Sequence, residues 1–67
     1  MESHLIKSAN TGGGWAIGLL RTIAYGNTVY QVVRMDPQSR YVVISNHDAE
    51  ADARKAANHE YRLDKAA

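Results

Sequence analysis

The middle of the chain alternates between β-rich segments and turn residues. Three segments rich in Val, Ile, Tyr and Thr run from Trp15 to Tyr25, from Thr28 to Met35 and from Arg40 to Ser45, and this composition favours strands. Gly26-Asn27 and Asp36-Pro37-Gln38-Ser39 separate them. Glycine supplies the positive φ of a two-residue hairpin turn, and Asp followed by Pro suits a type I turn. The pattern predicts a three-stranded antiparallel meander.

The C-terminal part of the chain predicts one helix. The segment Ala49–Lys65 is rich in alanine, and its acidic residues gather near the start, where they favour the positive end of the helix dipole. Asn46 or Asp48 can serve as the N-cap. The apolar residues fall on one narrow stripe, formed by Ala49, Ala53, Ala56, Ala57 and Leu63. We therefore expect an α+β fold, a meander packed by one C-terminal helix.

The first fourteen residues differ in character from the rest. Gly12-Gly13-Gly14 has high backbone entropy and predicts a loop. We interpret residues 1–14 as a flexible N-terminal arm with a Gly-rich loop, and residues 15–67 as a single β-β-β-α domain. A short additional strand around Leu5-Ile6-Lys7 is left open.

Composition excludes several classes of protein. The 67 residues carry a formal net charge of +1 and contain no cysteine, so disulfides and zinc-thiolate sites are excluded. The longest apolar stretch, Trp15–Leu20, is too short to span a bilayer. We expect a cytoplasmic protein with no membrane partner. Because so short a chain buries a marginal core, self-association as a homodimer or docking on a partner is expected to supplement it.

Both faces of the predicted sheet are apolar. Counting from the two turns places tyrosine and arginine side chains together on one face, whereas the other face is smaller and more aliphatic. We expect the alanine-rich helix to cover the aliphatic face and to leave the other bare, with Trp15 at its edge. The alternative is that the aromatic face is the core. The predicted partner-binding residues are Arg21, Tyr25, Tyr30, Arg34 and Tyr41.

Motifs of catalysis or metal binding are not found. The glycine triplet lacks the continuation of a phosphate-binding loop, and His47 and His59 are too far apart for a helical metal pair. We expect no enzyme, no cofactor and no metal. Glu60 lies within the apolar stripe, where a buried carboxylate needs a partner or a raised pKa. Either Arg21 or Gln31 provides that partner, or the helix bends, rotates or frays near Asn58.

These patterns favour a small non-catalytic protein-binding module, a regulator or inhibitor of a larger partner, of the size that phages and mobile elements encode. The alternative function is DNA or RNA binding through the Tyr/Arg face, because aromatic and basic side chains on a sheet can stack on and pair with nucleic acid. In element order, Trp15–Leu63 resembles three-stranded DNA-reading domains such as the arm-binding domains of integrases. The resemblance implies no site residue.

Overall fold

A computed structural model describes residues 2–38 and 40–66. Met1 and Ala67, at the ends of the predicted arm and domain, and Ser39 of the second predicted turn lie outside the described residues. The elements follow in the order β1 (Glu2–Gly12), β2 (Trp15–Ala24), β3 (Asn27–Met35), β4 (Tyr41–His47) and α1 (Glu50–Ala66).

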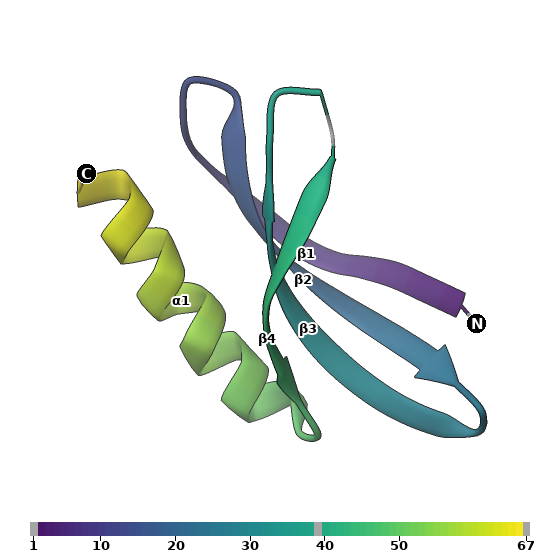
Figure 1. The fold of residues 1–67 in the computed structure, drawn as a ribbon. Helices are drawn as coiled ribbons and strands as arrows, with labels where there is room; N and C mark the ends of the chain where they lie inside the picture. Colours follow the sequence, from purple (N-terminus) through teal and green to yellow (C-terminus); the bar gives the residue numbers. More distant parts are fainter. Residues whose placement is uncertain (1, 39, 67) are drawn as a thin grey trace.

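The strands form one antiparallel sheet in the order β1-β2-β3-β4, and α1 lies along one side of it (Figure 1). The predicted α+β class, antiparallel sheet and C-terminal helix are confirmed. The sheet has four strands, so the strand left open near the N-terminus is present, and it pairs with β2 from Glu2 to Gly12.

The glycine run forms the tight turn of the hairpin between β1 and β2. The flexibility expected of residues 1–14 stays a prediction. Gly13 and Gly14 have φ values of 62° and 85°, and Gly12 pairs with Trp15 across the turn. Positive φ at both central residues is the requirement of a type I′ turn. A Cβ added to Gly14 would lie 3.1 Å from Pro37, so this turn packs against the turn between β3 and β4.

The β2–β3 turn is shifted by one residue from its predicted position. Its central residues are Tyr25 and Gly26, with φ values of 53° and 78°, instead of Gly26 and Asn27. Moving the turn by one residue moves the register by two, so each side chain keeps its predicted face. The observed register places Leu19 opposite Val32, and we attribute the shift to the packing of this pair.

The helix covers the face opposite to the one predicted. The buried core consists of Ile17, Leu19 and Val32 from the sheet and Ala53 from α1, with Tyr30 and Tyr61 packed against it. The prediction that α1 covers the more aliphatic face is therefore wrong. Alanines are small and leave room for large side chains beneath them, whereas the other face already contains small residues such as Gly18 and would leave the interface underfilled.

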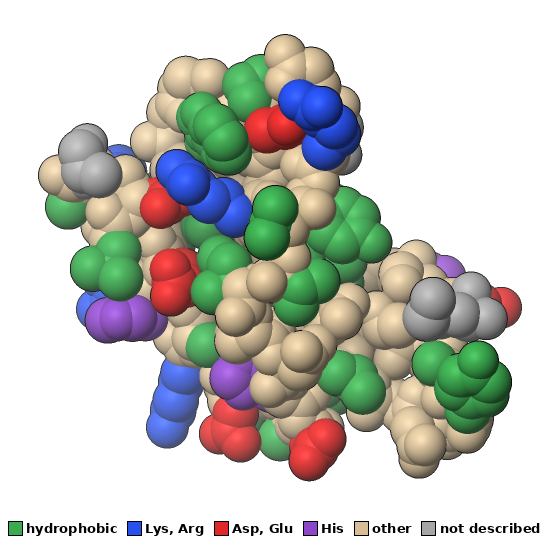
Figure 2. All heavy atoms as spheres, in the orientation of Figure 1, with side chains coloured by type: hydrophobic (Ala, Val, Ile, Leu, Met, Phe, Trp, Pro, Cys, Tyr) green, Lys and Arg blue, Asp and Glu red, His purple; other side chains and the backbone are tan. Residues whose placement is uncertain are grey.

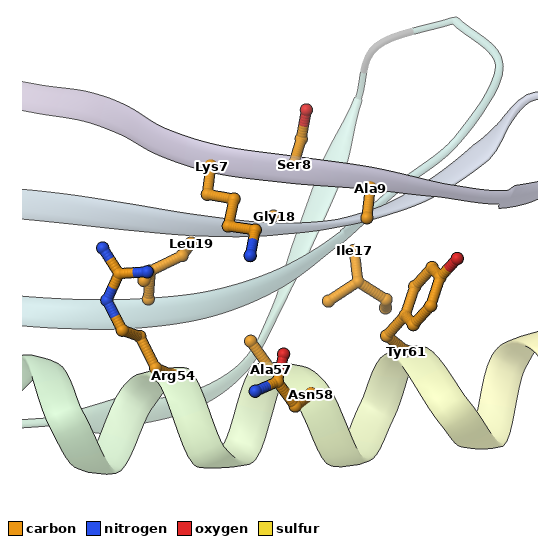
Figure 3. Close-up of a pocket in the computed structure, with 10 residues that line it drawn as sticks. All are labelled: Lys7, Ser8, Ala9, Ile17, Gly18, Leu19, Arg54, Ala57, Asn58 and Tyr61. Carbon is orange, nitrogen blue, oxygen red and sulfur yellow. The ribbon is translucent and has the colours of Figure 1, made fainter.

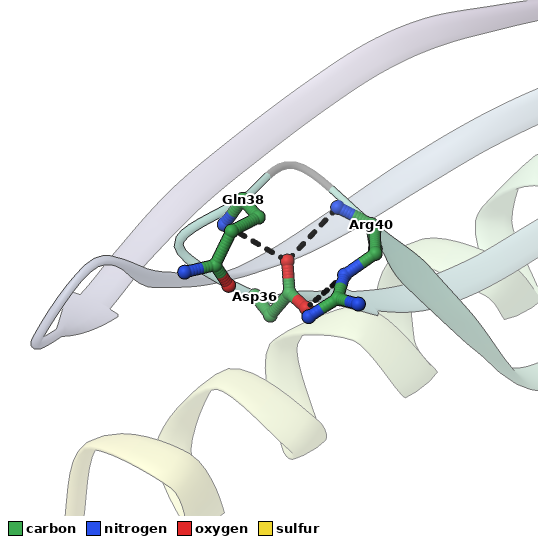
Figure 4. A network of polar contacts seen from close by, with 3 residues as sticks. All are labelled: Asp36, Gln38 and Arg40. Carbon is green, nitrogen blue, oxygen red and sulfur yellow. Dashed lines mark hydrogen bonds and ion pairs between the residues drawn. The ribbon is translucent and has the colours of Figure 1, made fainter.

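The β3–β4 turn is organised by Asp36 (Figure 4). One carboxylate oxygen accepts hydrogen bonds from the backbone N–H groups of Gln38 and Arg40, at 3.0 and 2.9 Å. The other oxygen lies 3.0 Å from the Arg40 Nε, and the Asp36 N–H donates to the Arg40 carbonyl at 2.8 Å. Asp36 is thus opposite Arg40. Three residues separate this pair, so the loop counted from it is one residue shorter than the predicted loop of four.

This shorter loop turns β4 over. Tyr41 pairs with Met35 and Val43 with Val33, so both lie on the face without the helix. The prediction that Tyr41 shares a face with Tyr30 is wrong, because a slip of one residue moves every side chain to the opposite face. A register shift past Ile44 then restores the original alternation, with Ser45 opposite Val32.

Two residues, Asp48 and Ala49, separate the end of β4 from the first residue of the helix. Asn46 belongs to β4, and the Ala53 N–H donates to the Ala49 carbonyl at 3.2 Å, so Ala49 occupies the N-cap position rather than Asn46 or Asp48. The helix continues through Asn58 without a break. Glu60 is half-buried on it, which removes the need for a buried charge partner.

Candidate functional site

The five residues predicted to bind a partner do not form one surface. Tyr30 packs under α1, and the Arg34 Nε donates to Asp64 on the helix at 2.9 Å. The Arg34 guanidinium also lies 4.3 Å from the centre of the Trp15 ring. Arg21 stands opposite Tyr30 and is exposed. The Tyr/Arg face is therefore not bare, because α1 covers part of it. DNA or RNA binding through this face stays a prediction.

The other two tyrosines lie far from that core. Tyr25 is fully exposed at the tip of the β2–β3 hairpin, in the left-handed region that disfavours a bulky residue. Tyr41 is 52% exposed on the face without the helix. A partner-binding role for any of the five residues stays a prediction.

A groove of about 270 Å³ lies between β1 and α1 (Figure 3). A helix is about 10 Å wide and four strands about 4.8 Å apart are wider, so one helix cannot cover both edges of this sheet. Ile17, Leu19 and Ala57 line the groove, and the side chains of Lys7 and Arg54 reach toward it. Arg54 is already bonded to Glu50 at 2.9 Å. The groove is smaller than the roughly 300–1,000 Å³ of most ligand pockets.

The helix-free face carries a row of polar side chains that crosses all four strands. Ser3 and Thr22 lie 3.0 Å apart, Thr22 donates to Gln31 at 3.0 Å, and Gln31 donates to Asn46 at 2.9 Å. Each polar side chain in the row forms a hydrogen bond with its neighbour, so the row fixes strand register and needs no ligand.

Beside this row lies a small apolar cluster. An added Cβ on Gly18 would come within 3.2 Å of the side chains of Leu5, Val33 and Met35, so these side chains converge over the glycine. Val33 is completely buried, while Leu5 is 51% exposed. The cluster is thus a second, thinner core that is open at its rim.

The most unusual surface follows the edge strand β4. Four consecutive apolar residues are exposed there, at 52%, 71%, 39% and 38%: Tyr41, Val42, Val43 and Ile44. Figure 2 shows hydrophobic side chains at the surface in this region. Between Arg40 and Asp48 the sequence contains no acidic or basic residue except His47. Nothing in the sequence of β4 therefore protects this edge by charge.

Helix α1 adds one apolar side chain to the same side of the molecule. Arg54 lines the groove toward β1, and Leu63 follows it by nine residues, which at about 100° per residue is half a turn round the helix. Leu63 therefore looks toward β4, and it is 54% exposed. We call Tyr41, Val42, Val43, Ile44 and Leu63 together the β4 flank.

The sequence contains a signal for the β4 flank. Residues that alternate along a strand divide between its two faces, but Tyr41-Val42-Val43-Ile44 is apolar at every position. An unbroken apolar run is typical of a strand covered on both sides. In this fold the run forms an edge instead, so it stays exposed.

The described residues contain neither a metal cluster nor a membrane helix. Within residues 2–38 and 40–66, His, Asp and Glu side chains nowhere form a group of three that could hold a metal ion. In the same ranges, no helix is long and apolar enough to cross a membrane.

Comparison with protein-family models, with curated proteins and with solved structures finds no match for this chain.

Proposed function

We propose that this chain is a small non-catalytic protein-binding module that docks a partner through the β4 flank. The observation that supports the proposal most strongly is the run of four exposed apolar residues on an unpaired sheet edge. Monomeric proteins normally blunt such edges with charges, bulges or covering elements, because an open edge pairs with other strands. Leu63 widens the apolar surface beyond the strand itself.

Strand addition is the mode of binding that this surface suits. Since β4 pairs with β3 on one side only, its outward backbone N–H and C=O groups are available to an extended segment of a partner. Backbone hydrogen bonds would supply affinity, and side chains that alternate between the two faces would supply specificity. Tyr41 and Val43 would contact the added strand from one face and Val42 from the other.

A regulatory or inhibitory role would follow from this mode. A chain of 67 residues that adds its sheet to the edge of a larger protein blocks whatever else uses that edge. We propose that the partner exposes a β-strand edge or an extended segment rich in β-branched or aromatic residues.

Selection from a random-peptide library displayed against the immobilised protein tests the proposal. We expect extended peptides with β-branched or aromatic residues at alternate positions. Val42→Lys should weaken their binding at least about tenfold, because a charged edge resists strand addition. Asn10→Lys on the opposite edge strand β1 is the matched control and should leave the affinity unchanged.

Peptides that bind Val42→Lys as tightly as the natural chain would contradict the β4 flank as the docking site. Peptides that lose affinity instead on substitution of Ala57 would move the site to the groove between β1 and α1. Circular dichroism of each variant verifies that the fold is retained.

A further inference from the structure

We propose that one partner of the β4 flank is a second copy of this chain, joined by antiparallel pairing of β4 with β4. This inference rests on the proposed function, because it names an occupant for the same surface. Antiparallel pairing of identical strands places a two-fold axis normal to the sheet, so that each copy presents the same edge to the other. The result is a continuous eight-stranded sheet.

This symmetry also brings the helices together. A two-fold axis normal to the sheet keeps both copies of α1 on the same face. Leu63 lies on the side of α1 that looks toward β4, so Leu63 from each copy approaches the interface above the paired strands. Stable interfaces bury about 800 Å² per partner, roughly a sixth of the 4604 Å² that this chain exposes. The strand and the helix together can contribute to such an area.

Charge at the two ends of β4 selects the antiparallel direction. Arg40 precedes the strand, with 78% of its side chain exposed and its Nε paired with Asp36. Asp48 follows the strand, and Glu50 beyond it is paired with Arg54. Antiparallel pairing places the basic end of one copy beside the acidic end of the other. Parallel pairing would place like charges together, which is unfavourable. The formal net charge of +1 adds little repulsion between copies.

The other edge is built against self-pairing. β1 carries Glu2 and Lys7, and its register with β2 is interrupted twice, between Leu5 and Lys7 and between Asn10 and Gly12. Charges and bulges are the usual means of blocking an edge. β4 has one interruption of its register, past Ile44, but no Lys, Arg, Asp or Glu lies within it. Pairing through β4 is therefore favoured over pairing through β1.

Sedimentation over a range of concentrations tests the dimer. We expect a species of twice 7.4 kDa at tens of micromolar, and a shift of the dissociation constant by at least about tenfold in Val42→Lys. Val42→Thr is a milder variant that keeps β-branching, and it should shift the constant in the same direction. Asn10→Lys should leave the dimer intact. A dissociation constant that is unchanged in both Val42 variants, or a dimer that dissociates in Asn10→Lys, overturns the inference.

Reversing the charge after β4 tests the strand direction. Asp48→Lys places a cation beside Arg40 of the other copy, so the dimer should weaken about two- to fivefold, as for an exposed ion pair. Asp48→Asn should have a smaller effect. A dimer strengthened by Asp48→Lys would overturn the antiparallel arrangement.

The peptide selection separates the two proposals. A chain that stays at 7.4 kDa at every concentration while β4 binds extended peptides contradicts the second copy and supports the protein-binding module. A monomer that binds no peptide at β4 contradicts both.

Discussion

β1 and β4 are the two edges of one sheet, but the side chains along them differ in kind. β1 is the longer strand and is mostly polar, with Glu2 and Lys7 along it and two interruptions of its register. β4 presents four consecutive exposed apolar residues. Both strands leave backbone groups unpaired on their outer sides, so both face the same risk of unwanted pairing. β1 carries two charged residues and two register interruptions against such pairing, whereas β4 carries one interruption, past Ile44, and no Lys, Arg, Asp or Glu.

The two edges also differ in how they are held. β1 is joined to β2 by a turn of two glycines. β4 is fixed at its start by the Asp36 turn and at its end by α1. An edge that is held at both ends keeps its outward groups in place for a partner, which reduces the ordering cost of binding.

The largest expected effect comes from removing the turn that holds β4. Asp36→Ala deletes the acceptor of two backbone N–H bonds and the partner of Arg40, so the free energy of unfolding should fall by about 2 kcal/mol. Asp36→Asn, which keeps one acceptor oxygen, should cost about half as much. Urea denaturation measures both. If Asp36→Ala changes stability by less than the Asn variant, the turn does not depend on this carboxylate.

A smaller loss is expected at the turn that holds β1. Gly14→Ala forces a side chain into the left-handed region and against Pro37, 3.1 Å away, and should cost about 1–2 kcal/mol. Gly26→Ala is the control, since Gly26 also has a positive φ but nothing within 4 Å of its added Cβ. The difference between the unfolding midpoints of the two variants gives the contribution of the packing of Gly14 on Pro37. Equal losses would show that this packing contributes nothing.

The smallest expected effect is a gain at the other end of β4. Ala49 occupies the N-cap of α1, where alanine cannot accept a hydrogen bond from the first turn. Ala49→Ser should raise the free energy of unfolding by about 0.5–1 kcal/mol. Thermal unfolding followed at 222 nm gives the shift in midpoint. Ala51→Ser, at the second residue of the helix, should not raise the free energy of unfolding. An increase there equal to that at Ala49 would contradict the assigned cap.

The order of β2, β3, β4 and α1 could be predicted from the sequence, whereas β1 was left open and the relative placement of the elements could not be predicted. Val, Ile and Tyr segments separated by glycine or Asp-Pro predicted β2, β3 and β4, and the alanine-rich segment predicted α1. The face covered by α1 was missed because both faces of β2 and β3 are apolar, so periodicity does not distinguish them. The choice depends on fitting Leu19 and Val32 beneath small alanines, which is a property of three-dimensional packing.

The position of one turn and the length of another explain the remaining differences between the predicted and observed structures. Local preference favoured Gly26-Asn27, but the turn forms at Tyr25-Gly26, where strand pairing outweighs the cost of a positive φ at tyrosine. The Asp36 turn is shorter by one residue, and this alone moved Tyr41 to the opposite face. The predicted grouping of Tyr41 with Tyr30 fails at that step. The exposure of β4 follows from strand order, which the sequence pattern does not determine for the outermost strands.

Amide hydrogen exchange compares the two edges directly, in one sample. At low micromolar concentration, the outward-facing amides of β1 and β4 should both exchange rapidly. Near millimolar concentration, those of β4 should slow by at least about tenfold as a second copy pairs with them, while those of β1 stay unchanged. Protection that grows on β1 and not on β4 would contradict the assignment of the β4 flank as the binding surface.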